Sequence, residues 1–336
     1  YKDILFDRLD YLILIMSKQF NTPNYIIVLG TTYSGSGAIY DYLSGRGDLY
    51  DPLNGTEYQL PQMPNGLMAL EATAQNAFHP ATADFVLSQF LEITDKLSRS
   101  RTPWRYGKNY SSMIPSFQKA IGEFVEEISA AKLPMNWHWR RLMQSQSPIM
   151  HILSKLKYHI GLSNNSPQTR LLVSEKDLLF AAQALHDKIF KSHADGRPVL
   201  LNQAGSGWNP IESTKYFLNR KVIIVTRDPR DQYFEIKYYK RASSVEAFID
   251  WYKEMNRRLE KINSSDILFI KFEDFVNNNN EIVDKLCEYV SLSTNISSNY
   301  QPNLSKENIG KYKKFLSQKE IDIIEIQLSK YIYNMK

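Results

Sequence analysis

The chain has one cysteine, Cys287, among 336 residues, so no disulfide can form within it. This lack predicts a reducing compartment and a cytoplasmic protein, with Cys287 as a core residue of an apolar helical pattern. Long apolar runs are also missing, the longest being residues 11–16 and 25–29. A transmembrane helix needs about 20 such residues, so the sequence predicts no membrane span.

A large excess of charge of one sign is missing as well. The chain has 41 Lys and Arg and 36 Asp and Glu, which leaves a formal net charge of +5. This mild excess suits an anionic small molecule but gives no reason to expect a nucleic-acid partner. The few histidines and the lone cysteine show no metal-ligand spacing, so no metal cofactor is expected.

Two segments about 200 residues apart stand out. Residues 25–38 read YIIVLGTTYSGSGA, and residues 221–231 read KVIIVTRDPRD. Each is an apolar, β-branched run that ends in polar residues, which is typical of a buried parallel strand with a ligand site at its carboxyl end. Two such ends side by side favour a nucleotide that carries phosphates at both ends.

The first segment predicts an anion cradle. Gly35 and Gly37 allow a tight turn, Ser34 and Ser36 offer hydroxyls, and residues 39–43 read as the start of a helix. No lysine follows the last glycine, so the kinase-type phosphate loop is absent, and so is the GxGxxG dinucleotide pattern. A tight turn without a ligand stays open as an alternative.

The second segment adds a phosphate-binding side chain. Arg227 follows the strand directly, where its planar guanidinium can grip phosphate with two hydrogen bonds. Asp228 is expected to cap the next helix, with Pro229 at its first position and Asp231 in its first turn. The alternative is a capped surface helix with solvated arginines.

These segments resemble the two nucleotide-binding motifs of the sulfotransferase family, whose members use 3′-phosphoadenosine-5′-phosphosulfate (PAPS). Residues 31–37 resemble its 5′-phosphosulfate loop, and residues 227–231 resemble its 3′-phosphate motif. Residues 267–276 (ILFIKFEDFV) resemble its strand and Glu-Asp-aliphatic turn, and residues 308–316 (NIGKYKKFL) its late Gly-x-aromatic-Lys loop. Bacterial members, including those of cyanobacterial natural-product and toxin pathways, are the nearest type.

The resemblance covers residues 25–57 and about 198–335 and leaves residues 60–195 unmatched. It implies a PAPS-dependent sulfotransferase that releases adenosine 3′,5′-bisphosphate (PAP) and needs no metal. The cofactor-binding positions that it implies are Thr32, Tyr33, Ser34, Gly35, Ser36, Gly37, Ala38, Arg227, Glu235, Lys306, Gly310 and Lys311.

Three of these positions depart from the family pattern. Tyr33 stands where many members have a Lys or Arg that stabilises the bridging oxygen as sulfate leaves. Ala38 stands where an aromatic residue often stacks on adenine. Glu235 replaces the serine that binds the 3′-phosphate, and we expect it to point elsewhere or to meet Arg230 or Lys237.

Sulfuryl transfer to a hydroxyl also needs a base near the loop. Asp51 and Glu57 follow an expected second strand at residues 47–52, and residues 55–58 (GTEY) resemble the segment of carbohydrate sulfotransferases that supplies a glutamate base. Glu57 is therefore the predicted base, with Asp51 second and His79 as a histidine candidate.

The acceptor site is predicted from position and composition. Asn202 and Trp208 follow a strand at the same edge as the cofactor, and Trp137 belongs to an aromatic middle region. Acidic residues near the entrance suggest a small polar or cationic acceptor, such as the guanidinium alkaloids of some toxin-pathway members: Asp48, Asp51, Glu57 and Glu71. A carbohydrate or glycolipid acceptor, a non-catalytic nucleotide-binding protein and a P-loop kinase-like phosphotransferase stay open.

The element order predicts one α/β domain over residues 1–336, with a P-loop-like, doubly wound parallel sheet flanked by helices. Residues 60–195 are expected to be a helical insertion after the second strand that shapes the acceptor pocket. Residues 1–20 read as an amphipathic helix that packs on the domain or on a partner subunit, so a homodimer stays open. The expected strands are 25–29, 47–52, 198–203, 221–226 and 266–271, and the expected helices of the later chain are 82–98, 116–131, 139–157, 175–192 and 280–290.

Overall fold

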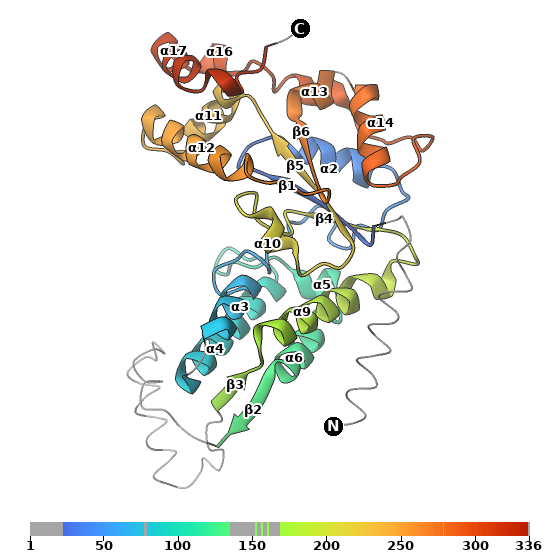
Figure 1. The fold of residues 1–336 in the computed structure, drawn as a ribbon, viewed down its shortest axis with the longest axis vertical. Coiled ribbons are helices and arrows are strands. Elements are labelled where there is room, and N and C mark those ends of the chain that lie inside the picture. The colour runs from blue at the N-terminus through green and yellow to red at the C-terminus, as the bar shows by residue number, and fades with distance from the viewer. Residues whose placement is uncertain are drawn as a thin grey trace.

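A four-stranded parallel sheet forms the centre of the protein (Figure 1). The computed structural model describes residues 23–76, 79–134, 169–277 and 279–334, together with residues 152, 156 and 160. The strands lie in the order β4 (Val199–Asn202), β1 (Tyr25–Gly30), β5 (Arg220–Thr226) and β6 (Ile267–Lys271), and all three neighbouring pairs are parallel. The predicted α/β class with a parallel sheet is confirmed.

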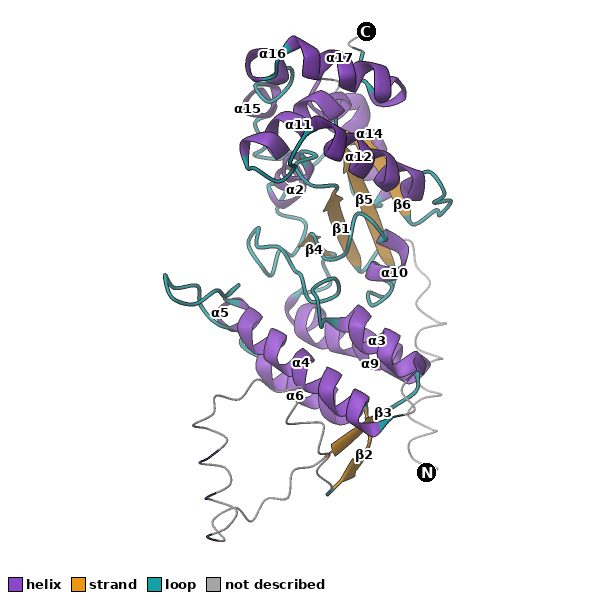
Figure 2. Ribbon diagram, turned by 90° about the vertical axis from the view of Figure 1, so that its left-hand side faces the viewer, coloured by secondary structure: helices purple, strands orange, loops and turns teal. Residues whose placement is uncertain are grey.

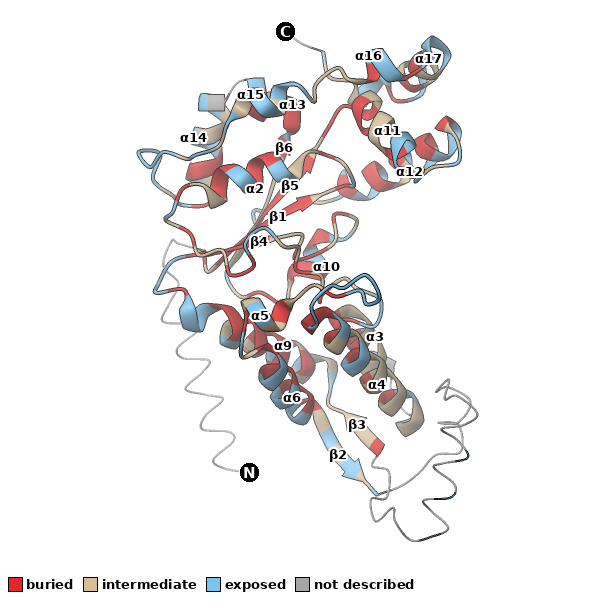
Figure 3. Cartoon of the chain, turned by 180° about the vertical axis from the view of Figure 1, so that it is seen from behind, coloured by how far each residue is buried: buried red, intermediate tan, exposed pale blue. Residues whose placement is uncertain are grey.

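Helices cover both faces of this sheet. Alternate residues of β1 are therefore buried on opposite sides. Ile26 and Val28 pack against α2 (Ser36–Ser44), α13 (Phe272–Asn277) and α14 (Asn279–Tyr289). Tyr25, Ile27 and Leu29 belong to the core that contains α11 (Pro229–Tyr238) and α12 (Val245–Leu259). Figure 3 shows the strands buried between these layers. A strand buried on both faces has to be continuously apolar, as the sequence of β1 is.

A mainly helical part lies beside the sheet (Figure 2). Its core is continuous with that of one sheet face, since Phe90, Phe124 and Leu185 belong to the same buried cluster as Leu29. Its elements are α3 (Leu67–Asn76), α4 (Pro80–Ser98), α5 (Tyr110–Met113), α6 (Phe117–Glu127), α9 (Glu175–Phe190) and an antiparallel pair of strands, β2 (Ser129–Leu133) and β3 (Thr169–Leu172). The remaining short elements are η1 (Lys191–His193), α10 (Pro210–Thr214), α15 (Pro302–Lys306), α16 (Tyr312–Phe315), α17 (Gln318–Gln327) and η2 (Ser329–Tyr331).

Two sequence-based expectations about these elements are wrong. Residues 47–52 form no strand, because only Tyr50 pairs with Val199, as an isolated bridge. The expected helix 116–131 ends at Glu127, and β2 follows, since pairing with β3 outweighs the helix preference of its alanines. The expected helices 1–20 and 139–157 fall in the part that the structure leaves undescribed, apart from residues 152 and 156. Within the described ranges, every helix is too short or too polar to span a bilayer.

Candidate functional site

The register of the sheet brings the two predicted motifs together. Gly30, the last residue of β1, lies opposite Val225 of the neighbouring β5. The loop after Gly30 and the side chain of Arg227 therefore leave the same edge of the sheet side by side. This carboxyl edge is where ligands bind in open parallel sheets.

The loop itself has an uncommon backbone. Thr32, Tyr33 and Gly35 have φ angles of 67°, 52° and 80°, in the left-handed region. Glycine adopts this region freely, but a β-branched threonine and a bulky tyrosine do so rarely. Such conformations persist only when surrounding contacts enforce them, and they are concentrated at functional sites.

The enforcing contacts hold three consecutive carbonyl groups. The Gln232 amide nitrogen donates to the carbonyl oxygens of Thr31 and Thr32, at 2.6 and 2.5 Å. Arg227 Nη1 donates to the Tyr33 carbonyl oxygen at 3.0 Å. Among the described residues, the amide N–H groups from Thr32 to Gly37 have no acceptor. Free donors at the positive end of a helix can bind an anion, so these N–H groups at the start of α2 form a candidate anion-binding nest at residues 32–37.

The side chains of Ser34 and Gln203 hold the loop in place through hydrogen bonds. The Thr31 amide donates to Ser34 Oγ at 3.0 Å, which gives the buried Ser34 hydroxyl a positioning role. Gln203 accepts from the Gly30 amide at 3.2 Å and donates to Ser36 Oγ at 3.0 Å. The Ser36 hydroxyl therefore keeps its own proton for a ligand. Ala38 is buried in α2, with 7% of its surface exposed.

Arg227 is buried beside the nest, with 4% of its surface exposed. Its guanidinium lies 5.2 Å from the centre of the Phe272 ring and donates to the Asn308 carbonyl at 2.7 Å through Nη2. Its Nε has no hydrogen-bond partner among the described residues, although it is buried. A buried N–H without an acceptor is costly, and an anionic ligand would satisfy it.

Glu235 lies on Arg227, which corrects the expectation that it would avoid this group. Its Oε1 accepts from Arg227 Nη1 at 2.6 Å. The two cations that it was expected to meet are engaged elsewhere. Arg230 pairs with Asp228 at 2.7 Å and with Glu325 at 2.6 Å. Lys237 pairs with Glu320 at 2.8 Å.

The late loop reaches the same site. Asp231 accepts from the amides of Gly310 and Tyr312, at 2.7 and 3.0 Å, and burial raises its pKa above the ordinary value. Lys311 donates to the Asn308 side chain at 2.7 Å. Lys306 is exposed at the end of α15. The predicted motifs around residues 33, 227 and 310 are thus contiguous in space.

Glu273, in helix α13 directly after β6, supports the start of α11. Its Oε1 accepts from the Asp228 amide at 2.8 Å, and the side chain is buried. Burial raises the pKa of this carboxyl to about 7. Its other oxygen, Oε2, has no partner in the described part of the chain.

The predicted base, Glu57, lies next to the end of β4. Its carboxylate accepts from Gln59 Nε2 at 2.9 Å and from Lys108 Nζ at 3.1 Å, and 44% of the side chain is exposed. The Tyr58 amide donates to the Asn202 carbonyl at 2.8 Å, and the Asn202 side chain donates to the Gly55 carbonyl at 3.0 Å. Asn202 therefore fixes the segment that carries Glu57.

The other two base candidates have structural contacts. Asp51 accepts from the Leu53 amide at 3.2 Å and from the Tyr40 hydroxyl, so both of its contacts stabilise the turn. His79 caps α4, where its Nδ1 accepts from the Ala81 amide at 3.2 Å. Glu57 keeps 44% of its side chain exposed and lies in a segment that is hydrogen-bonded to the end of β4.

The predicted acceptor residues are dispersed. Glu71 is buried and accepts from the Tyr216 hydroxyl at 2.7 Å, with Lys215 also at 2.8 Å. Asp48 pairs with Arg46 at 2.7 Å. These contacts correct the expectation of a four-carboxylate entrance. Trp137 lies outside the described residues.

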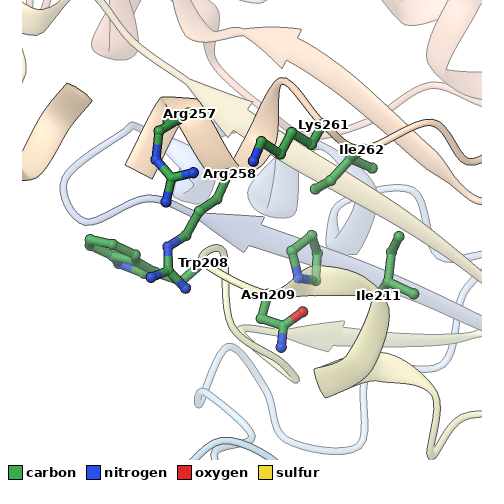
Figure 4. A pocket seen from close by; sticks show the side chains of 8 residues that line it. Trp208, Asn209, Ile211, Arg257, Arg258, Lys261 and Ile262 are labelled. Atoms are coloured by element: carbon green, nitrogen blue, oxygen red, sulfur yellow. The ribbon is translucent and has the colours of Figure 1, made fainter. Parts of the chain in front are cut away.

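Trp208 faces α12 rather than the loop. Its ring meets Trp251 edge-on at 5.9 Å, and the Arg258 guanidinium lies 5.9 Å from its centre. It lines an open cavity of about 390 Å³ with Asn209, Pro210, Ile211, Arg257, Arg258, Lys261 and Ile262 (Figure 4).

The structure adds four residues that sequence reasoning missed: Gln203, Gln232, Phe272 and Lys108. Gln232 and Glu235 are three residues apart on α11, so a helical reading of the 3′-phosphate motif could have placed both toward the loop. Lys108 lies in the unmatched middle region, where no pattern marked it. Tyr33 stacks on Tyr239, the residue that follows α11, with ring centres 5.1 Å apart. Across the described ranges, no group of three or more His, Cys, Asp or Glu residues could hold a metal ion.

No family model matches the chain, and no curated protein does. Solved structures that are similar to it are sulfotransferase domains. The domain from the Synechococcus PCC 7002 olefin synthase has 13% identity and a TM-score of 0.42, and the match covers 95% of this chain and 98% of that one. The domain from the curacin biosynthetic pathway has 12% identity and a TM-score of 0.41, covering 94% and 100%. Mouse sulfotransferase SULT7A1, solved with PAP, has 12% identity and a TM-score of 0.30, covering 44% and 70%.

Proposed function

We propose that this chain is a PAPS-dependent sulfotransferase that transfers a sulfuryl group to a hydroxyl of a small polar metabolite. The observation that carries the proposal is the nest of free N–H groups at residues 32–37, together with the carbonyls of residues 31–33 that Gln232 and Arg227 bind. The nest suits a phosphosulfate, and the buried Arg227 with its unpaired Nε suits a second phosphate. A ligand with anionic groups at both ends matches both features.

The residues would act by positioning charge and moving one proton. When bound, PAPS supplies the sulfuryl group together with a phosphate leaving group. The loop amides, with Ser36, would bind the developing negative charge, since fixed N–H donors need no reorganisation during the reaction. Glu57 would take the proton from the acceptor oxygen, while Gln59 and Lys108 hold its carboxylate.

The acceptor is proposed by class. A partly exposed carboxylate near the end of β4 suits a hydroxyl, an amine or a carbamoyl nitrogen. The stacked rings of Tyr33 and Tyr239 offer an aromatic surface at the nest. A carbohydrate acceptor has the support of the segment around Glu57. A guanidinium alkaloid has less support, because Asp48 and Glu71 are engaged elsewhere.

A non-catalytic nucleotide-binding protein is the second candidate. It is favoured by Tyr33, an aromatic residue at the loop position where a cation would stabilise the leaving group. A phosphotransferase is disfavoured, because the loop has no lysine after its last glycine.

Two measurements test the proposal. Calorimetry with PAP should show binding, and Arg227→Ala should weaken it by about 10- to 150-fold, as expected for a lost charge-assisted hydrogen bond of about 1.5–3 kcal/mol. Incubation with sulfur-labelled PAPS and a metabolite extract should then transfer label to an acceptor. Unchanged PAP affinity in a folded Arg227→Ala variant would refute the nucleotide site, and binding without any labelled acceptor would favour the non-catalytic candidate.

A further inference from the structure

The ion pair between Glu235 and Arg227 lies inside the proposed nucleotide site. It lies at the group that is proposed to bind a phosphate of the nucleotide, and Glu235 Oε1 is only 2.6 Å from Nη1. Nη1 also donates to the Tyr33 carbonyl, so both of its protons are used. The carboxylate therefore takes a donor that an incoming phosphate needs.

Both anions cannot use this donor together. A phosphate oxygen within hydrogen-bond distance of Nη1 would lie beside the Glu235 carboxylate, and two like charges in contact repel strongly. Arg227 is fixed by the Asn308 carbonyl and by the Phe272 ring, so it is the carboxylate that has to move. The Nε proton stays free and gives a phosphate its first contact.

Glu235 is able to leave. A quarter of its side chain is exposed, compared with 2% for Arg227. In the described part of the chain, Arg227 is the only donor to its carboxylate. Its neighbours on α11 do not hold it either, because Lys237 and Arg230 have their own carboxylate partners.

We infer that Glu235 occupies, in the free protein, the position on Arg227 that the nucleotide's 3′-phosphate takes, so that binding displaces it. This inference rests on the proposed function and names a residue that sets nucleotide affinity. In the free protein Glu235 neutralises a buried cation, which would otherwise destabilise the fold. Because the nucleotide has to displace it, Glu235 competes with the 3′-phosphate for Arg227 and so lowers the affinity for PAP.

The test compares two nucleotides that differ at the 3′ position. Affinities for PAP and for adenosine 5′-monophosphate are measured by calorimetry with the wild type, Glu235→Gln and Glu235→Ser. We expect both variants to bind PAP about tenfold or more tightly, because the repulsion is gone, and to leave adenosine 5′-monophosphate affinity unchanged. Glu288→Gln, which removes an exposed carboxylate of α14, is the matched control and should change neither affinity.

A second readout guards against a folding defect. Without nucleotide, Glu235→Gln should melt about 2–4 °C below the wild type, because Arg227 loses its counter-ion, and PAP should raise its melting temperature more than that of the wild type. If the wild type binds PAP and Glu235→Gln binds it no more tightly, the displacement is refuted while the nucleotide site stands. If no form binds PAP, the proposed function fails too.

Discussion

The Phe272 ring occupies the space in which a side chain at Gly35 would lie. A Cβ atom built on Gly35 would be 2.4 Å from Phe272 Cδ2, and Gly35 has a φ of 80°. The same ring packs under the Arg227 guanidinium. One side chain therefore sets the position of both proposed anion-binding groups.

Gly35→Ala should damage both stability and nucleotide binding. The left-handed backbone costs a non-glycine residue about 1–2 kcal/mol, and the contact with Phe272 adds to this. We expect a lower free energy of unfolding in urea and a large loss of PAP affinity. Gly122→Ala is the control, since a Cβ there meets nothing within 4 Å and α6 gains helix propensity. Equal behaviour of the two variants would contradict this role of Gly35.

Gln232→Ala should weaken PAP binding even though Gln232 donates only to protein carbonyls. Without its amide, the carbonyls of Thr31 and Thr32 lose the contacts that turn them away from the nest. Calorimetry should show about a tenfold or greater loss of affinity, as when two buried hydrogen bonds of roughly 1 kcal/mol each are removed.

The matched control is Gln183→Ala. Gln183 is also buried and donates to one backbone carbonyl, that of Lys215, but it lies in the helical part. Gln183→Ala should lower the free energy of unfolding and leave PAP affinity unchanged. If both glutamine variants bind PAP like the wild type, Gln232 does not shape the nest.

Glu57→Gln should lower turnover by about 10²- to 10⁴-fold and leave PAP affinity nearly unchanged, because the amide keeps the size of the side chain but cannot take a proton. Steady-state rates with the labelled donor and an identified acceptor measure this effect. Asp51→Asn, which disturbs the turn at Leu53, should retain most of the turnover. The reverse ranking of the two variants would assign the base to Asp51.

Glu273 should make stability depend on pH. Its pKa is raised from 4.5 to about 7 in the folded protein, so the folded state binds this proton more tightly than the unfolded state does. The stabilisation is complete below pH 4.5 and is lost as pH rises toward 7, by up to about 3 kcal/mol. Urea unfolding between pH 4.5 and 7.5 should show this decline.

Glu273→Gln imitates the protonated acid and should reduce the decline. Asp231, whose pKa is also raised by burial, contributes a change of the same sign to both proteins. The difference between the two curves therefore isolates Glu273. Parallel curves would show that the Glu273 carboxyl is ionised in the folded protein throughout this range.

The sequence by itself determined the four strands of the parallel sheet and the place of the candidate site. Continuous apolar runs such as that of β1 can only be buried on both faces, and the polar residues directly after β1 and β5 must then meet at one edge. These are local patterns, so Arg227 and the glycine loop were recognisable without coordinates. The strand pair β2–β3 was not, since its alanines favour a helix until distant residues offer a partner.

Only the tertiary structure decided how the site is held. Which side chain reaches a backbone carbonyl depends on the packing of α11 against the loop, and that packing gave Gln232 its role and brought Glu235 to Arg227. The same holds for Lys108, which meets Glu57 across 51 residues of chain. Long-range contacts of this kind leave no spacing in a sequence, because they arise from the relative placement of elements that are far apart in it.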